Sequence, residues 1–205
     1  MLPRLWLCAD LSHPAFGPGG PWVEHLAHAQ RLAPVTLWLR PTATTPARQL
    51  LEFARVAKGA LSDVSVLLVG DRVDVALAAG AHGVHLPERA LEVGDVRALA
   101  SGVGRSLCVS AAVHDLEGVS RRLGADALVA SPFEPVAGKG PALGERGLRA
   151  LRERAPGAFL VALGGLLDES SCARALAAGA DAVALRRLWL DAPLPEALAA
   201  VVTAR

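Results

Sequence analysis

The chain has 205 residues, of which 52% are hydrophobic and 20% charged, so it carries enough apolar side chains for one sizeable core. Its formal net charge is +1, and acidic and basic residues are interspersed, which argues against a nucleic-acid footprint or a polybasic membrane anchor. The apolar stretch at the N-terminus, Leu5–Ala9, is too short for a signal peptide or a membrane span, so we expect a cytoplasmic protein without nucleic-acid or membrane partners.

Short apolar runs alternate with amphipathic segments along the whole chain. We expect strands at Leu5–Ala9, Val35–Arg40, Ser65–Gly70, Gly83–Leu86, Ser106–Ser110, Ala127–Ala130, Phe159–Leu163 and Ala182–Leu185. We expect helices at Pro21–Leu32, Pro46–Lys58, Val73–Ala79, Val93–Ala100, Leu116–Leu123, Glu145–Arg154, Ser170–Ala178 and Pro195–Ala204. Nearly all-apolar strands are typical of a parallel sheet that is buried on both faces. The alternation predicts an α/β fold, a single (β/α)8 TIM barrel over residues 1–205.

A repeated turn supports this fold. The junctions Gly80–Val84, Gly124–Leu128 and Gly179–Val183 each place a glycine after a helix and then enter a buried strand. A doubly wound open sheet uses similar turns and is the alternative. We favour the barrel because no G-x-G-x-x-G motif follows the first strand.

Three cysteines, Cys8, Cys108 and Cys172, are widely spaced and form no CxxC pair. An odd, scattered set of this kind argues against a disulfide framework or a zinc site. We therefore expect reduced, buried thiols.

The looser segments follow strands, so they belong to the barrel face where TIM-barrel enzymes keep their chemistry. One of them, Ser131–Leu143, carries Lys139 between two glycines. This lysine is either a cationic arm that reaches a phosphate or a solvated loop residue. The glycines Gly164 and Gly165 follow the seventh strand, where backbone N–H groups can approach a phosphate.

Other polar residues also follow predicted strands. Arg186 and Arg187 follow the eighth strand, where they add charge to an anion site or begin a solvated helix. His114 follows the fifth strand and is the best-placed histidine for acid–base chemistry, with a capping or surface role as the alternative. His85 lies within a predicted strand, so its side chain is either packed in the core or available as a ligand in the site. Asp71 is expected to cap the next helix rather than bind a metal.

These segments resemble the thiamine-phosphate synthase/TenI superfamily in chain order. The resemblance rests on Gly70–Leu77 with Gly83–Pro87, on Val113–Glu117 with Gly124–Asp126, and on Leu163–Gly165 with Ala178–Val183. It covers nearly the whole chain. It implies a (β/α)8 barrel that binds a thiazole phosphate, a small phosphorylated substrate.

The synthase branch of this family is expected to hold a pyrimidine pyrophosphate with a Gln-x-Arg-x-Lys pattern after strand two. Only Arg40 matches it, because Trp38 and Thr42 replace the other two residues. The family's magnesium site uses an Asn-Asp pair after strand three and an Asp after strand four. Here these positions are Gly70–Asp71 and Ala90, so a single carboxylate remains and the synthase reaction is disfavoured.

The TenI-type thiazole tautomerases need no such metal site, and the chain is closer to them in Leu86–Pro87 and Val113–His114. The resemblance implies that His114 is the general acid/base and that Gly164 and Gly165 form the phosphate site. Lys139 matches a lysine-bearing loop only loosely. Arg187–Leu188 replaces the usual Ser-Gly after strand eight, so Arg186 or Arg187 must compensate at the phosphate.

Three hypotheses follow. The first is a TenI-like tautomerase of thiamine biosynthesis that isomerises a thiazole carboxylate phosphate by proton transfer, with no cofactor. The second is a thiamine-phosphate synthase that couples thiazole phosphate with hydroxymethylpyrimidine pyrophosphate and uses Mg²⁺, with Asp71 as its remaining ligand. The third is a non-catalytic barrel that binds a ligand or regulates a partner. All three hypotheses are compatible with a homo-oligomer.

Overall fold

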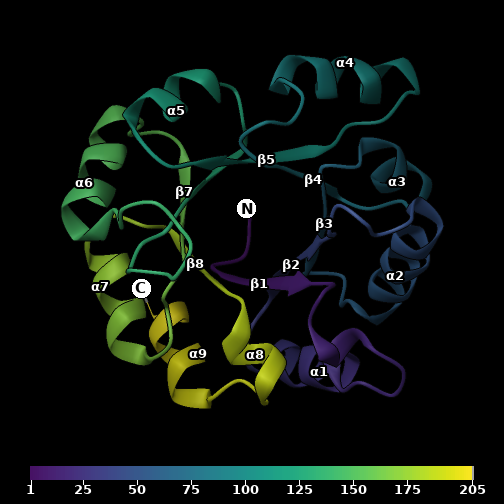
Figure 1. The fold of residues 1–205 in the computed structure, drawn as a ribbon, viewed down its shortest axis with the longest axis horizontal. Coiled ribbons are helices and arrows are strands. Elements are labelled where there is room, and N and C mark those ends of the chain that lie inside the picture. Colours follow the sequence, from purple (N-terminus) through teal and green to yellow (C-terminus); the bar gives the residue numbers. More distant parts are fainter. Residues whose placement is uncertain (205) are drawn as a thin grey trace.

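The computed structural model describes residues 1–204 as a closed barrel of parallel strands surrounded by helices (Figure 1). Each strand pairs with the next along the chain, and the last pairs with the first, as predicted for a TIM barrel. The strands are β1 Leu5–Asp10, β2 Val35–Arg40, β3 Val66–Gly70, β4 Gly83–Leu86, β5 Cys108–Val113, β6 Ala127–Ala130, β7 Phe159–Leu163 and β8 Ala182–Leu185.

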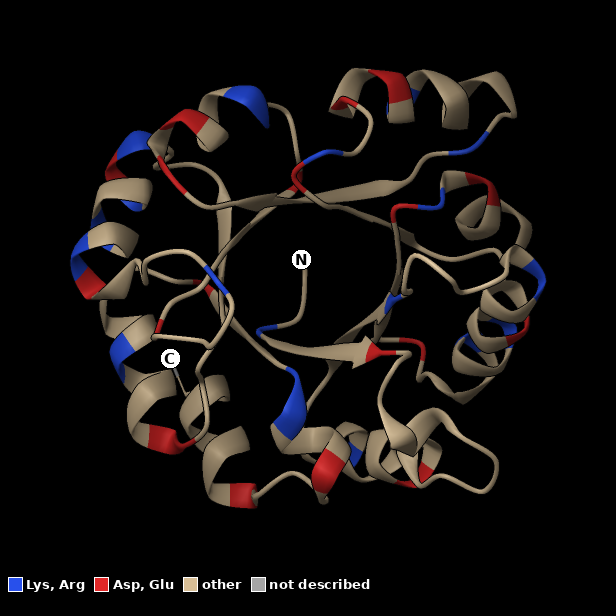
Figure 2. Ribbon diagram, in the orientation of Figure 1, with Lys and Arg blue, Asp and Glu red and all other residues tan. Residues whose placement is uncertain are grey.

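The helices form the outer layer, and Figure 2 shows most charged residues on the helices and loops rather than on the strands. They are α1 Trp22–Leu32, α2 Ala47–Ala60, α3 Val73–Ala78, α4 Val93–Gly102, α5 Leu116–Arg121, α6 Gly144–Arg154, α7 Glu169–Ala177, α8 Arg187–Asp191 and α9 Glu196–Thr203, with a short 3-10 turn at Pro14–Phe16. Within residues 1–204 no helix combines the length and the apolar character that a membrane crossing requires.

Alternate residues of each strand face two different cores. On β1, Leu5 and Leu7 belong to the large apolar layer between strands and helices, whereas Trp6 and Cys8 belong to a smaller cluster inside the barrel. Successive strand side chains point to opposite faces, which explains this division. The barrel interior is therefore filled by side chains, and only residues near the strand ends reach its openings.

The fifth strand lies further along the chain than predicted. It starts at Cys108 rather than Ser106 and extends past Ser110 to Val113. Ala111 and Ala112 pair with Leu128 and Val129 of β6, so tertiary pairing recruits alanines that have little β propensity of their own. As a result, His114 follows the last residue of β5 directly.

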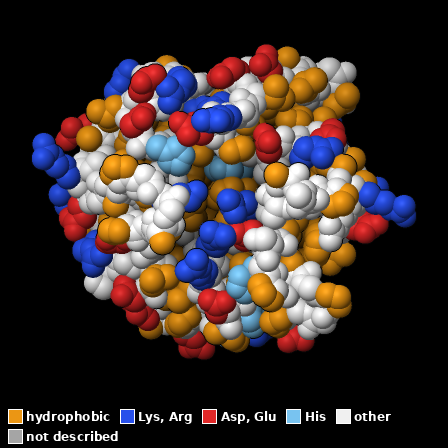
Figure 3. All heavy atoms as spheres, in the orientation of Figure 1, with side chains coloured by type: hydrophobic (Ala, Val, Ile, Leu, Met, Phe, Trp, Pro, Cys, Tyr) orange, Lys and Arg blue, Asp and Glu red, His pale blue; other side chains and the backbone are white. Residues whose placement is uncertain are grey.

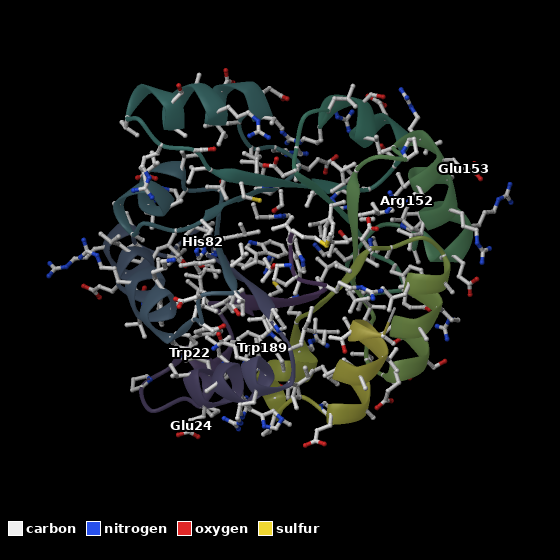
Figure 4. All side chains as sticks on the ribbon, turned by 180° about the vertical axis from the view of Figure 1, so that it is seen from behind. Trp22, Glu24, His82, Arg152, Glu153 and Trp189 are labelled. Atoms are coloured by element: carbon white, nitrogen blue, oxygen red, sulfur yellow. The ribbon has the colours of Figure 1, made fainter. Side chains whose placement is uncertain are left out.

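The face at the N-terminal ends of the strands is occupied by structural contacts. His82, labelled in the view from behind (Figure 4), accepts a hydrogen bond from the Leu67 amide at 2.8 Å. Arg152, on the side of α6 in that view, donates to the carbonyl oxygens of Gly179 and Ala158 at 2.9 and 2.8 Å. These residues stabilise the turns into β4 and β8.

The three cysteines are free thiols, as predicted. Cys8 and Cys172 are buried, whereas Cys108 is only partly buried, which corrects the expectation that all three lie in the core. Burial raises the pKa of Cys8 to about 12, so this thiol stays protonated at neutral pH.

Candidate functional site

Three charged side chains enter the opening of the barrel at the C-terminal ends of neighbouring strands. Asp10 ends β1 and is paired in register with Arg40, the last residue of β2, while Arg186 directly follows β8. The two-residue alternation that points Cys8 and Trp38 into the barrel gives Asp10 and Arg40 the same inward direction. β1 lies between β2 and β8, so these three residues come together.

Asp10 holds this group together and is 1% exposed. Its Oδ1 accepts hydrogen bonds from the Ser12 amide at 3.1 Å and the Ser12 hydroxyl at 2.7 Å. Its Oδ2 accepts from Nη1 of Arg40 at 2.8 Å and from Nη2 of Arg186. Burial raises the pKa of Asp10, but the Ser12 hydrogen bonds and the charges of Arg40 and Arg186 outweigh it, so the net pKa is lowered. The carboxylate is therefore ionised at neutral pH.

The two arginines remain accessible although their shared partner is buried. The side chains of Arg40 and Arg186 are each 40% exposed. Figure 3 shows Lys and Arg side chains gathered near the centre of this face, over the strand ends. The barrel opening therefore presents positive charge, which favours an anionic ligand.

His114 stands on the opposite part of the rim, directly after β5. Its Nδ1 lies 2.5 Å from the carbonyl oxygen of Ser131, the residue after β6. A carbonyl oxygen only accepts, so Nδ1 is the donor of this hydrogen bond and Nε2 is the ring nitrogen left for a ligand. His114 is exposed, so this nitrogen can reach a ligand in the opening.

A small recess beside His114 is formed by Glu88, Val113 and the arginines Arg121 and Arg122. Arg122 is 4% exposed and donates to the carbonyl oxygens of Pro87 and Glu88 at 2.9 and 2.8 Å. It thereby fastens the loop after β4 against α5 on one side of the histidine.

Gly164 and Gly165, after β7, both have positive φ values, 100° and 73°. Within residues 1–204 their amides have no hydrogen-bond partner, so they can donate to an anion. The same glycines also allow close packing, because a Cβ on Gly165 would lie 2.4 Å from the Cβ of Glu134. The glycine pair thus serves the loop after β6 as well as the candidate anion site.

The remaining predicted cations are exposed. Lys139 lies in the loop between β6 and α6, whose ends are fixed by hydrogen bonds from Phe133 to Leu163 and from Leu143 to Pro132. Arg187 starts α8 and faces solvent, unlike its neighbour Arg186. Within the described residues neither Lys139 nor Arg187 forms a salt bridge, so the structure does not join them to the Asp10 group.

Comparisons with known proteins identify the family. The model of the thiamine monophosphate synthase family matches residues 18–188 of the chain. The chain belongs to the thiamine monophosphate synthase family. It is 35% identical over 192 residues to the thiamine-phosphate synthase of Koribacter versatilis, covering 90% of this chain and 87% of that protein. It is 38% identical over 145 residues to that of Methanoculleus marisnigri, covering 68% and 67%. The thiamine phosphate pyrophosphorylase structure from Pyrococcus furiosus superposes with a TM-score of 0.78 at 24% identity, covering 97% and 95% of the chains.

The magnesium site that the family resemblance implies is not matched by the residues present. A Cβ on Gly70 would lie 2.9 Å from the carbonyl oxygen of Leu39 and 3.1 Å from Nε1 of Trp38, so a longer side chain would have to displace them. Asp71 is exposed, and no group of three or more His, Cys, Asp or Glu side chains suited to a metal occurs within residues 1–204. This donor set does not fit a magnesium ion.

The prediction that Asp71 caps the next helix is wrong. The N-cap of α3 is Arg72, and no side chain hydrogen-bonds to the first turn. Asp71 instead has a φ of 60°, a left-handed conformation that Asp adopts more readily than most residues.

Asp10 is the main residue that the sequence interpretation omitted from the predicted site. Its position after an apolar strand was visible, and the alternation with Trp6 and Cys8 indicates an inward side chain. Its two arginine partners were not predictable from this pattern, because Arg186 is 176 residues away in the sequence.

Proposed function

We propose that this member of the thiamine monophosphate synthase family isomerises a thiazole phosphate by proton transfer, with His114 as general acid and base. The observation that supports this most is the hydrogen bond between His114 Nδ1 and the Ser131 carbonyl oxygen. It orients the ring and directs Nε2, the other ring nitrogen, to the barrel opening. An imidazole held in one orientation suits a shuttle that must both accept and donate a proton.

The proposed reaction needs only a proton acceptor and an anchor. Nε2 of His114 takes a proton from one position of the thiazole tautomer and returns a proton at another position. Substrate and product therefore have the same atomic composition. The amides of Gly164 and Gly165 hold the phosphate. Lys139, exposed in the loop after β6, is the cation that we assign to the same phosphate.

The test compares His114→Ala with His28→Ala. His28 is a matched control because its ring also hydrogen-bonds a carbonyl oxygen, that of Leu194 at 2.9 Å, but it does so on α1 in the outer layer. We expect His114→Ala to lower kcat for tautomer conversion by about 10²–10⁴-fold, the usual contribution of general acid–base catalysis. The His28→Ala rate should stay within twofold. An unchanged rate in His114→Ala, measured by NMR of the two tautomers, would contradict the proposal.

The second candidate function is thiamine-phosphate synthesis, which the names of the relatives favour. Proteins 33% to 38% identical to this chain are named thiamine-phosphate synthase. Retention of Arg40 at the pyrophosphate position is consistent with it. This reading predicts Mg²⁺-dependent thiamine phosphate formation from thiazole phosphate and hydroxymethylpyrimidine pyrophosphate. Absence of thiamine phosphate at saturating substrate concentrations would exclude this function. Assaying both reactions by chromatography on one protein preparation distinguishes the two candidate functions.

A further inference from the structure

The outward face of α4 carries few charges for a helix on the surface of the barrel. α4 packs on the barrel through Val93, Val96 and Ala100. Its exposed residues are mostly small or apolar, and they are Gly94, Asp95, Arg97, Ala98, Leu99, Ser101 and Gly102. On α6, by contrast, every exposed residue is charged, namely Arg146, Arg149, Glu153 and Arg154. A helix that is apolar on both sides is expected to be covered on both sides.

Large apolar side chains extend this face at both ends of α4. Leu91 in the loop before α4, Leu99 on α4 and Val103 at its C-terminal end are 46%, 51% and 62% exposed. Figure 3 shows hydrophobic side chains gathered at the upper right of the molecule, where Figure 1 places α4. Arg122 holds the loop before α4 in place through a hydrogen bond to the Leu91 carbonyl oxygen at 2.9 Å. An exposed apolar patch held in one conformation is typical of a protein–protein interface.

The glycines of this face have no role that the single chain explains. Beyond its own helical turn, a Cβ on Gly94 or Gly102 would meet no atom of the described residues within 4 Å. Neither glycine has a positive φ, so alanine would fit both positions. Glycine inside a helix is less favourable than alanine. With Ala98 midway between them, the two glycines form a row of small residues that a second helix can approach closely.

Two charges at opposite ends of the face indicate which partner covers it. Asp95 lies in the first turn of α4, and Arg105 follows its C-terminal end. Both are exposed, and within residues 1–204 the side chain of neither forms a salt bridge or a hydrogen bond, whereas Arg97 pairs with Asp126 at 3.1 Å. In a two-fold dimer with antiparallel α4 helices, the first turn of each helix lies beside the end of the other. Asp95 of each copy then faces Arg105 of the other copy.

We propose that the α4 face binds the same face of a second copy of this chain, with the two α4 helices antiparallel. The α4 face is formed by Leu91, Gly94, Ala98, Leu99, Gly102 and Val103. It is complementary to itself, because apolar side chains meet apolar side chains and opposite charges meet at both ends. Antiparallel helices also bring opposite ends of their macrodipoles together. This inference does not depend on the proposed function.

The dimer would also cover one edge of the candidate site. The loop after β4 contains Leu91 of the α4 face and Glu88, which lines the recess beside His114. Arg122 holds this loop from inside through the carbonyl oxygens of Glu88 and Leu91. A second copy that covers Leu91 therefore restricts the same loop from outside.

Analytical ultracentrifugation of the full chain measures the dissociation constant of the dimer over a range of about 1–100 μM. The variants are Leu99→Glu and a matched control, Val56→Glu, whose valine is 53% exposed on α2. Leu99→Glu places like charges against each other in an apolar contact, so we expect the dissociation constant to rise at least about a hundredfold. Val56→Glu should match the wild type, and circular dichroism checks that both variants are folded.

Charge reversal tests the antiparallel arrangement. Asp95→Arg and Arg105→Asp should each weaken the dimer, because each places like charges together at both ends of the contact. The double variant should restore the dissociation constant of the wild type. Gly94→Ala should weaken the dimer and also raise the melting temperature of the dilute, monomeric protein. A role of Gly94 within the single chain would not give this combination.

Three results would count against the proposal. A wild type that stays monomeric over the whole range would overturn it and leave the α4 face to a different partner. A dimer that Leu99→Glu does not weaken would place the interface elsewhere and also overturn it. A double charge-reversal variant as weak as the single variants would contradict the antiparallel pairing of the helices.

Discussion

The indole of Trp38 packs against the imidazole of His85, with ring centroids 3.8 Å apart and 40° between the planes. His85 is 2% exposed, and its Nδ1 lies 2.9 Å from the hydroxyl oxygen of Ser110 on the next strand. The pair lies inside the barrel below Arg40, so it forms the floor of the candidate site. His85 is thus a packed core residue, one of the two alternatives that the sequence left open.

The burial of His85 predicts a pH dependence of stability. Burial, followed by the charges of Arg40 and Arg122, lowers the pKa of His85 from 6.5 to about 3. Between these values the unfolded chain binds the proton and the folded chain does not, so stability is lost as the pH falls below about 6.5. His85 should contribute a slope of about 1.4 kcal/mol per pH unit in that window.

This contribution is checked by urea denaturation of the wild type and His85→Leu at pH 7 and pH 5. The variant should lose less stability between the two pH values than the wild type does. Val84→Ala, which removes buried methyl groups from the same strand, should lower stability equally at both. Equal pH slopes in the wild type and His85→Leu would refute the assignment.

The close approach of Gly165 to Glu134 predicts that this glycine is irreplaceable. In Gly165→Ala the new Cβ would lie 2.4 Å from the Cβ of Glu134, at a φ of 73°. Gly19 is a matched control, because its φ is 72° but a Cβ there meets nothing within 4 Å. The strained φ costs both variants about 1–2 kcal/mol, and the clash adds about 1–3 kcal/mol at Gly165 alone.

Thermal melting and phosphate titration of Gly165→Ala and Gly19→Ala measure the difference. We expect only Gly165→Ala to lose phosphate affinity, since only that glycine lies in the candidate anion site. Similar melting temperatures for the two variants would show that the loop after β6 moves aside without cost.

Arg121, the last residue of α5, and Arg122, its C-cap, are predicted to contribute very different amounts to the free energy of unfolding. Buried Arg122 supports three carbonyl oxygens in the loop after β4, those of Pro87, Glu88 and Leu91. Its removal leaves these acceptors unpaired, so Arg122→Ala should cost about 3 kcal/mol. Arg121 is 46% exposed and pairs with Glu117, and its replacement by Ala should cost less than about 1 kcal/mol. Chemical denaturation distinguishes the two, and comparable losses would contradict the structural role of Arg122.

The donor set after β3 predicts that a chelator does not impair tautomer conversion. Gly70 has no side chain to bind a metal, and Trp38 and the Leu39 carbonyl oxygen occupy the space that a side chain at this position would need. The rate measured by NMR should be the same with EDTA as with added Mg²⁺. A rate that falls with EDTA and returns with Mg²⁺ would mean that residues other than this set hold a metal.

Much of the barrel could be predicted from local patterns. Apolar runs such as Val35–Arg40 and the glycine turns at Gly80, Gly124 and Gly179 were sufficient, because burial on both faces and left-handed turns have strong local signals. The start and end of β5 were predicted wrongly, since alanines become strand residues only when a neighbouring strand pairs with them. The predicted cap at Asp71 was wrong for a related reason: its amide donates a hydrogen bond to the His85 carbonyl oxygen of β4, and this contact is not visible in the local sequence.

The sequence by itself determined the alternation of strands and helices, and therefore which residues stand at the strand ends where Arg40, His114 and Gly165 lie. Only the closed barrel decided which of these ends meet. β1 acquires its second neighbour when β8 closes the sheet, and this closure places Arg186 on the same Asp10 oxygen as Arg40. Hydrogen bonds between residues far apart in the chain depend on strand order and register. Those follow from the packing of the whole fold rather than from any local run of residues.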